Sequence, residues 1–243
     1  MTYLLRLVAC LFLCVSLNAF AALYDRGNGL IYDDVLDITW LQDINYSKTS
    51  GHDVDGLMIW QDAKQWVDNL NYAGYNEWRL PSANLINGSD PCYSFDGSCD
   101  LGYNNIISEF GYMYYSNLGN SAAYSSNGTY GQNFESFNIR FSSGESGELV
   151  SFFSGLPSET DPYQWGIPFW LNEELESDTG RVWLFFTSIG RQLTYPKYPN
   201  SDGLFSSWAV HDGDIGASPV PLPAAAWLFG SALVGLGLVR RSK

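Results

Sequence analysis

The segment from about Leu57 to Asn69 constrains the fold most, because its apolar residues recur at the spacing of an α-helix. We expect Asp55 or Gly56 to cap this helix and Gly74 to end the segment. The apolar positions, which should face the core, are Trp60, Ala63, Trp66, Val67 and Leu70. The polar positions on the opposite face are Gln61, Asp62, Lys64, Gln65 and Asp68. The pattern predicts an amphipathic helix that packs on the core through its tryptophans.

Other segments predict β-structure. Residues 30–32 and 38–41 are β-prone and flank an aspartate-rich turn, which indicates a hairpin. A second hairpin is predicted from residues 181–187 and 192–195. Between helix and second hairpin, Pro81 forces Leu80 into an extended conformation and marks a boundary before another short helix. The chain is therefore expected to be α+β, with the following residues in its core: Trp60, Trp66, Trp78, Leu80 and Trp183.

The N-terminus has the organisation of a secretory signal peptide. Arg6 precedes an apolar run from Leu7 to Leu17, which is too short to span a bilayer. Ala19-Phe20-Ala21 then matches an A-x-A cleavage site. We expect residues 1–21 to be removed after Ala21, and residues 22–216 to form an exported domain.

The C-terminus, residues 217–243, has the organisation of a sorting signal. An apolar stretch at residues 224–239 predicts a transmembrane helix, and the basic residues after it mark its cytoplasmic end. The motif resembles the VPLPA variant of the PEP-CTERM signal, carried by Val220, Pro221, Leu222, Pro223, Ala224, Arg240 and Arg241. The resemblance implies anchoring in the cytoplasmic membrane facing the periplasm, recognition by an exosortase-type enzyme, and release to the cell surface or extracellular matrix.

The exported part is strongly acidic. The two end segments contain four basic residues and no acidic one; the basic residues are Arg6, Arg240, Arg241 and Lys243. Their removal lowers the totals from 12 basic and 26 acidic side chains to 8 and 26, a formal charge of −18. Such a charge excludes a nucleic-acid-binding protein, which needs a basic surface. Four aspartates cluster around the first hairpin. They indicate either turn residues or calcium ligands, and they are Asp33, Asp34, Asp37 and Asp43.

Two cysteines remain after removal of the signal peptide, Cys92 and Cys99. In an oxidising compartment two cysteines so close in sequence predict a disulfide that closes a small loop. A catalytic dithiol is the alternative, although the spacing is not C-x-x-C.

Several segments together resemble the Lcl C-terminal domain family. The matching pieces are W-x-x-A-x-x-W-x-x-x-L-x-x-x-G-Y-x-x-W-R-L-P over residues 60–81, the first hairpin, residues 169–173, and a closing strand at residues 208–214 in which His211 stands where the family has Arg. The likeness covers residues 23–215 in pieces, and the middle diverges. It implies a C-type lectin-like fold, related to formylglycine-generating enzymes, with a twisted, mostly antiparallel sheet, two helices and long loops. The Ser-, Gly- and Tyr-rich stretch from Gly119 to Ser151 is either a loop or a set of short strands.

We expect a non-catalytic binding module. The exported part has two histidines, no metal-ligand spacing and no G-x-S-x-G motif. Extracellular polysaccharide is the expected partner, because aromatic rings stack on sugar faces while carboxylates and amides bind hydroxyl groups. Trp170, Asn172 and Glu173 combine these groups in one segment, and the alternative is that Trp170 belongs to the core and Glu173 is merely solvated. No cofactor other than calcium is expected. The competing functions are a passive structural matrix protein or a secreted enzyme.

Overall fold

The computed structural model describes residues 23–86, 88, 90–131, 168–197 and 203–216. The predicted signal peptide, the sorting signal with its helix at residues 224–239, and residues 132–151 of the Ser- and Tyr-rich stretch lie outside the described residues. Within the described part of the chain, no helix is both long enough and apolar enough to span a bilayer.

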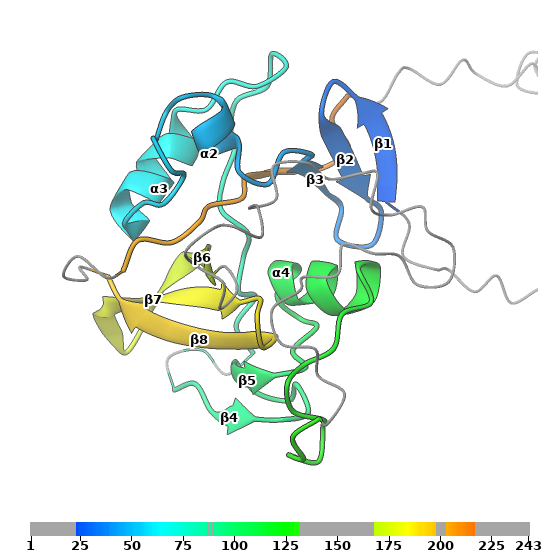
Figure 1. Cartoon of the computed structure of the whole chain (residues 1–243), viewed down its shortest axis with the longest axis vertical. Helices are drawn as coiled ribbons and strands as arrows, with labels where there is room; N and C mark the ends of the chain where they lie inside the picture. The colour runs from blue at the N-terminus through cyan, green and yellow to red at the C-terminus, as the bar shows by residue number, and fades with distance from the viewer. Residues whose placement is uncertain (1–22, 87, 89, 132–167, 198–202, 217–243) are drawn as a thin grey trace, which may run out of the picture.

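The first sheet brings the beginning and the end of the described chain together. Its strands are β1 (Leu23–Gly27), β2 (Leu30–Asp33), β3 (Ile38–Leu41) and β9 (Val210–Asp212), in the order β1-β2-β3-β9 and all antiparallel. The predicted first hairpin is β2–β3, with Leu30 opposite Leu41 and Asp33 opposite Ile38. Figure 1 shows this sheet on the right of the upper half of the molecule.

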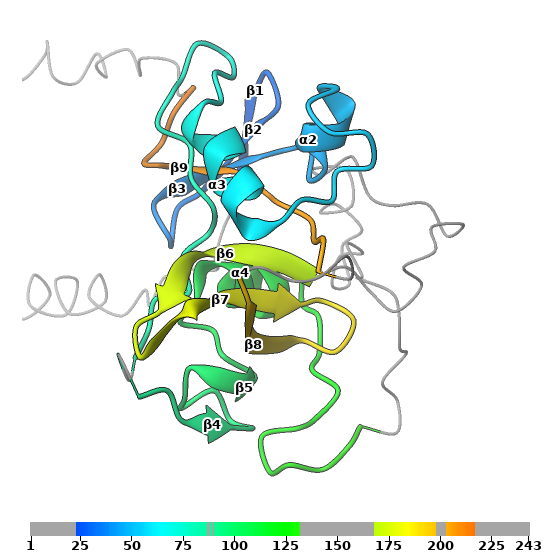
Figure 2. The ribbon, with the colours of Figure 1, turned by 90° about the vertical axis from the view of Figure 1, so that its left-hand side faces the viewer.

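The second sheet forms the lower half (Figures 1 and 2). Its strands are β4 (Tyr93–Ser94), β5 (Leu101–Tyr103), β6 (Pro168–Leu175), β7 (Asp178–Phe186) and β8 (Arg191–Pro196), in the order β4-β5-β8-β7-β6. Neighbouring strands are antiparallel except β4 and β5. The predicted second hairpin is β7–β8, and the Trp170 segment adds β6 to its edge. Two sheets with short helices confirm the α+β class.

The helices are short: α2 (Tyr46–Thr49), α3 (Trp60–Asp68) and α4 (Glu109–Tyr112), which continues into a π-helical turn, η1 (Met113–Asn117). The predicted tryptophan-faced helix is α3, but it begins three residues later than expected. The delay arises because Met58 exchanges two backbone hydrogen bonds of 3.0 Å with Phe205 and is held extended. The N-cap residue at the helix start is Ile59, so neither Asp55 nor Gly56 caps the helix as expected, and the Asp55 carboxylate instead accepts a hydrogen bond from the Leu57 N–H.

One aromatic core joins the two sheets. The ring of Phe110, on α4, lies 4.9 Å from that of Phe169 and 5.0 Å from that of Phe185, both in the second sheet. The same ring contacts Trp40 of the first sheet at 6.3 Å. The structure confirms that the five expected core residues Trp60, Trp66, Trp78, Leu80 and Trp183 are all buried.

Arg79 lies at the centre of a charged network between distant segments. Its guanidinium donates two hydrogen bonds of 2.7 Å to the Glu109 carboxylate at the start of α4, and further bonds of 2.6 and 2.9 Å to Asp212 on β9. Burial alone would lower the pKa of Arg79, but these bonds and the charge of Glu109 outweigh it and raise the pKa. The Glu109 side chain is only 8% exposed, so its charge depends on Arg79 for compensation.

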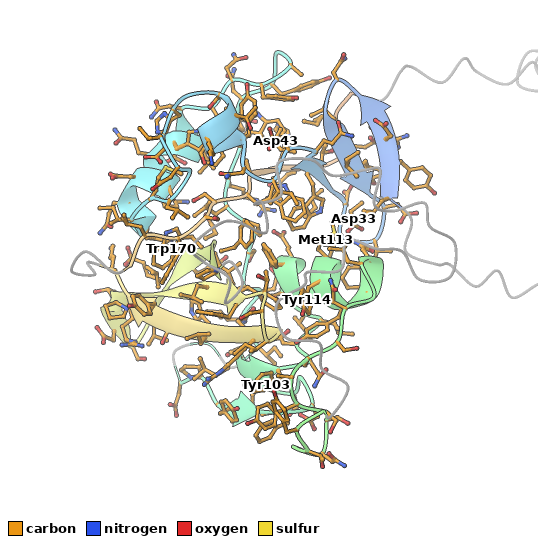
Figure 3. The ribbon with its side chains drawn as sticks, in the orientation of Figure 1. Asp33, Asp43, Tyr103, Met113, Tyr114 and Trp170 are labelled. Carbon is orange, nitrogen blue, oxygen red and sulfur yellow. A yellow bond between two sulfur atoms is a disulfide. The ribbon has the colours of Figure 1, made fainter. Side chains whose placement is uncertain are left out.

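A disulfide and an aromatic cluster form the lower tip. Cys92 and Cys99 are joined, in agreement with the prediction, and the bridge closes a loop of sequence separation 7 beside β4. The cluster stacks Phe95 on Tyr103 at 5.7 Å and extends to Tyr124. Figure 3 shows Tyr103 in this group of rings, far from Trp170.

Replacing Arg79 with Ala should lower the free energy of unfolding by about 3–5 kcal/mol, because it leaves the buried Glu109 carboxylate without its cationic partner. Arg79→Lys keeps the charge but not the bidentate geometry. Its free energy of unfolding should therefore lie between those of wild type and Arg79→Ala. The measurement is chemical denaturation followed by tryptophan fluorescence.

Arg26→Ala is the matched control, because its ion pair with Asp214 has side chains 25% and 30% exposed and should contribute less than about 1 kcal/mol. Equal losses in Arg79→Ala and Arg26→Ala would contradict the role assigned to the buried pair.

Candidate functional site

Trp170 does not provide a surface for stacking on a ligand, which corrects the expectation. Its side chain is 0% exposed, and its indole Nε1 donates a 2.7 Å hydrogen bond to the carbonyl oxygen of Met58. Its ring packs 4.7 Å from Phe205. Figure 3 shows Trp170 between β6 and the elements above it. The first four residues of β6 are all buried, so the core alternative is the correct one for Trp170.

Asn172 and Glu173 are half-buried and already bonded to protein groups. The Glu173 carboxylate accepts hydrogen bonds from the Ser82 hydroxyl at 2.6 Å and from the Ala83 backbone N–H at 2.7 Å. Asn172 Oδ1 accepts a 2.5 Å bond from Lys64 Nζ on α3. Glu173 therefore fixes the chain after Pro81, whereas Asn172 positions a lysine.

The four aspartates of the first hairpin do not converge on one point. Asp33 and Asp43 lie apart in Figure 3, and among the described residues no three His, Cys, Asp or Glu side chains are grouped to hold a metal ion. Asp37 accepts a 2.9 Å bond from the Tyr32 hydroxyl, and Asp43 accepts one of 3.0 Å from the Asn45 backbone. These contacts fit the turn-residue alternative of the sequence prediction.

Asp33 points into the protein. Its Oδ1 accepts 3.1 Å hydrogen bonds from the N–H groups of Val35 and Leu36, and its Oδ2 accepts one of 2.6 Å from the Asn117 amide. Burial raises the pKa of Asp33, and the bonds from Leu36, Asn117 and Val35 oppose that rise without cancelling it. The carboxylate therefore holds the hairpin turn against η1.

A hollow lies on one flank of α3. It has a volume of about 610 Å³, and its wall includes three aromatic rings, those of Tyr46, His52 and Trp66. The rings of His52 and Trp66 are 6.4 Å apart. The polar groups of the wall include Asp53, Asp62, Gln65, Asn69 and Asn71. We call this hollow the aromatic pocket.

A second hollow of about 480 Å³ lies on the other flank of α3 and is called the lysine pocket. It is lined by Trp60, Gln61, Lys64, Gln65, Asp68, Asn69 and Lys197. Because Gln65 and Asn69 line both hollows, the two pockets adjoin across the exposed face of α3. All five residues predicted for the outer face of this helix line one pocket or both.

The two pockets differ in charge. In the aromatic pocket, partial burial acts to raise the pKa of Asp53, but the backbone N–H groups of Gly56 and Asp55 bind the carboxylate and the pKa ends below its usual value. Asp53 and Asp62 therefore make this pocket anionic at neutral pH. The lysine pocket contains two of the three lysines in the described part of the chain, Lys64 and Lys197.

This arrangement can bind a polar ligand that carries both apolar faces and hydroxyl groups. The exposed His52 ring and the half-buried Tyr46 ring offer stacking surfaces, and the Gln65 amide offers donors and an acceptor. The Asn69 and Asn71 amides each donate one hydrogen bond within the protein, to the Gln65 carbonyl oxygen and to Asn76 Oδ1, and contribute their remaining donor and acceptor capacity. The sequence prediction placed α3 but selected β6 for ligand contact. Lysine is scarce in this acidic chain, and a lysine on α3 is the sequence signal that would have indicated this helix as the candidate site.

Comparison of the chain with protein-family models, with curated proteins and with solved structures gave no match. The resemblance to the Lcl C-terminal domain family is therefore still a prediction from the sequence motifs.

We expect Asp33→Asn to be at least as stable as wild type at neutral pH. The substitution removes a buried charge. Once the Asn117 amide flips, the new amide can donate to Asn117 Oδ1, which has no hydrogen-bond partner within the described residues. Because the pKa of Asp33 is raised in the folded state, wild type should lose stability as pH rises from about 4 through that raised pKa. Asp33→Asn should lack this loss.

The measurement is the free energy of unfolding against pH, with the exposed Asp34→Asn as control. A wild-type pH slope that persists in Asp33→Asn would contradict the assignment.

Proposed function

We propose that the protein is an exported, non-catalytic module that binds extracellular polysaccharide through the exposed face of α3. The observation that carries the proposal is the pair of adjoining pockets on this helix. A polysaccharide binds through several consecutive sugar units. Two adjoining hollows that share Gln65 and Asn69 can contact such a stretch of sugars.

The chemistry of the aromatic pocket supports this ligand class. Binding sites for small polar ligands combine apolar walls with a few well-placed polar groups. Here, Tyr46 and the exposed His52 supply the accessible rings of the wall, and exposed Gln65 and Asn69 supply amide groups. The Ser50 hydroxyl donates to the carbonyl oxygen of Ser47 at 3.3 Å, so it is not directed at His52 as a nucleophile would be.

The scaffold also favours a binding role. Residues 57–59 and 204–206 tie α3 to the closing segment, and Trp60 Nε1 donates a 2.8 Å hydrogen bond to the carbonyl oxygen of Leu171. A helix fixed at its start and through its buried tryptophan holds the groups on its outer face at constant spacing. We further propose that the scaffold is lectin-like, on the strength of the motif resemblance alone.

Calorimetry with the exported protein and the exopolysaccharide of the organism that makes it tests the binding proposal. We expect saturable binding, and the double variant Gln65→Ala/Asn69→Ala should weaken it about tenfold, because two exposed amides are lost at no cost to the core. Ser126→Ala, exposed on another loop, is the matched control. Parallel titrations with calcium and with a chelator test the calcium proposal.

Absence of binding both with calcium and with chelator would overturn the polysaccharide proposal and favour a passive structural protein. Binding that is unchanged in the double variant would keep the function but remove α3 as its site.

We propose that the protein reaches this ligand by export and C-terminal processing. The support is the signal-peptide pattern that ends at Ala21 and the VPLPA-type tail. Intact mass spectrometry of the surface or secreted protein should show a chain that begins at Ala22 and lacks Arg240 and Arg241. A product that retains both arginines in a strain with an active exosortase would refute the sorting step.

A further inference from the structure

The lysine pocket brings together two of the few basic side chains of a strongly acidic protein. The exported part has only 8 basic side chains against 26 acidic ones. Lys64 lies on α3 and Lys197 directly follows β8, so two lysines distant in sequence line one hollow. In an acidic protein, a local positive site attracts an anionic group that the rest of the surface repels.

The two lysines have different electrostatic partners. Lys197 forms an ion pair with Glu174, and its ammonium lies 5.1 Å from the centre of the Trp60 ring. Lys64 Nζ is held by the neutral Asn172 Oδ1 at 2.5 Å. Among the residues that the structure describes, no carboxylate forms an ion pair with Lys64, although Asp68 lines the same pocket. Within the described residues, the Lys64 ammonium is therefore held by a neutral amide and not by an ion pair.

Gln61 gives a second, independent indication of a ligand. It lines the lysine pocket, and both polar atoms of its amide are shielded from solvent without a hydrogen-bond partner in the described part of the chain. A buried amide without partners is unfavourable. A ligand that bears acceptor and donor groups would satisfy this amide once the side chain turns towards the pocket.

We propose that the lysine pocket binds the carboxylate of an acidic sugar residue, so that the polysaccharide recognised on α3 contains uronic acid. This inference rests on the proposed function and specifies its ligand. Lys64 donates a charge-assisted hydrogen bond to the carboxylate, Gln61 binds a neighbouring oxygen, and Asn172 positions the ammonium. Asp53 and Asp62 make the aromatic pocket unfavourable for a second anion, so we assign it to a neutral sugar of the same chain.

A matched pair of polymers tests the inference: the exopolysaccharide of the producing organism, before and after chemical reduction of its carboxyl groups to alcohols. Reduction removes the charge and keeps the sugar sequence. Wild type should bind the native polymer about tenfold more tightly than the reduced one, the effect expected for one charge-assisted hydrogen bond in a partly exposed pocket. Lys64→Gln should bind both polymers equally, at the affinity of the reduced one.

The controls separate charge, position and folding. Lys64→Arg should retain most of the preference, and Lys48→Gln, which removes an exposed lysine of α2 outside both pockets, should retain all of it. Gln61→Met should weaken binding of the native polymer severalfold without lowering the melting temperature, because it removes an unpartnered buried amide. A purely structural role for Gln61 would instead lower the melting temperature.

The outcomes distinguish this inference from the function on which it rests. Equal affinity of wild type for both polymers, or tight binding of an exopolysaccharide that contains no uronic acid, would overturn the inference and leave the proposed function standing. Absence of binding to either polymer would overturn the proposed function.

Discussion

The buried ion pair between Arg79 and Glu109 is the interaction on which the arrangement of the other elements depends. Arg79 binds Asp212 as well, so one guanidinium joins α4, β9 and the segment before Pro81. Glu109 also accepts a 2.7 Å bond from the Ser82 N–H, and Ser82 in turn donates to Glu173 on β6. Because a buried charge is tolerated only with its partners in place, these segments must assemble together.

This network ends next to the proposed binding surface. The backbone N–H of Asn172 donates a 2.9 Å bond to the Pro81 carbonyl oxygen, and the Asn172 side chain holds Lys64. The lysine of the proposed carboxylate site is thus positioned by the same strand that the Arg79 network fixes in place. The three carboxylates of this network, those of Glu109, Glu173 and Asp212, all accept hydrogen bonds from protein donors, and none of them forms an ion pair with Lys64.

Local patterns predicted the elements whose hydrogen bonds join residues close together in the sequence. The α3 periodicity and the β2–β3 and β7–β8 hairpins are of this kind, and all three are present, with α3 shortened by the pairing of Met58 with Phe205. The prediction for Trp170 was wrong because a tryptophan beside polar residues on a strand looks the same whether its face is covered or open. Only the packing of Phe205 over it decides. The choice between turn residues and calcium ligands for the aspartates likewise depends on the direction in which each carboxylate points, and the sequence does not show that direction.

The sequence by itself determined the α+β class, the buried tryptophans, the paired cysteines and the acidic charge, because these follow from periodicity, composition and short spacings along the chain. Tertiary structure decided that Arg79 meets Glu109 and Asp212, that Phe110 packs between two sheets, and that Lys64 and Lys197 meet at one pocket. Each of these contacts joins residues far apart in sequence. No local pattern encodes such a meeting, since it depends on how the two sheets pack around a shared aromatic core.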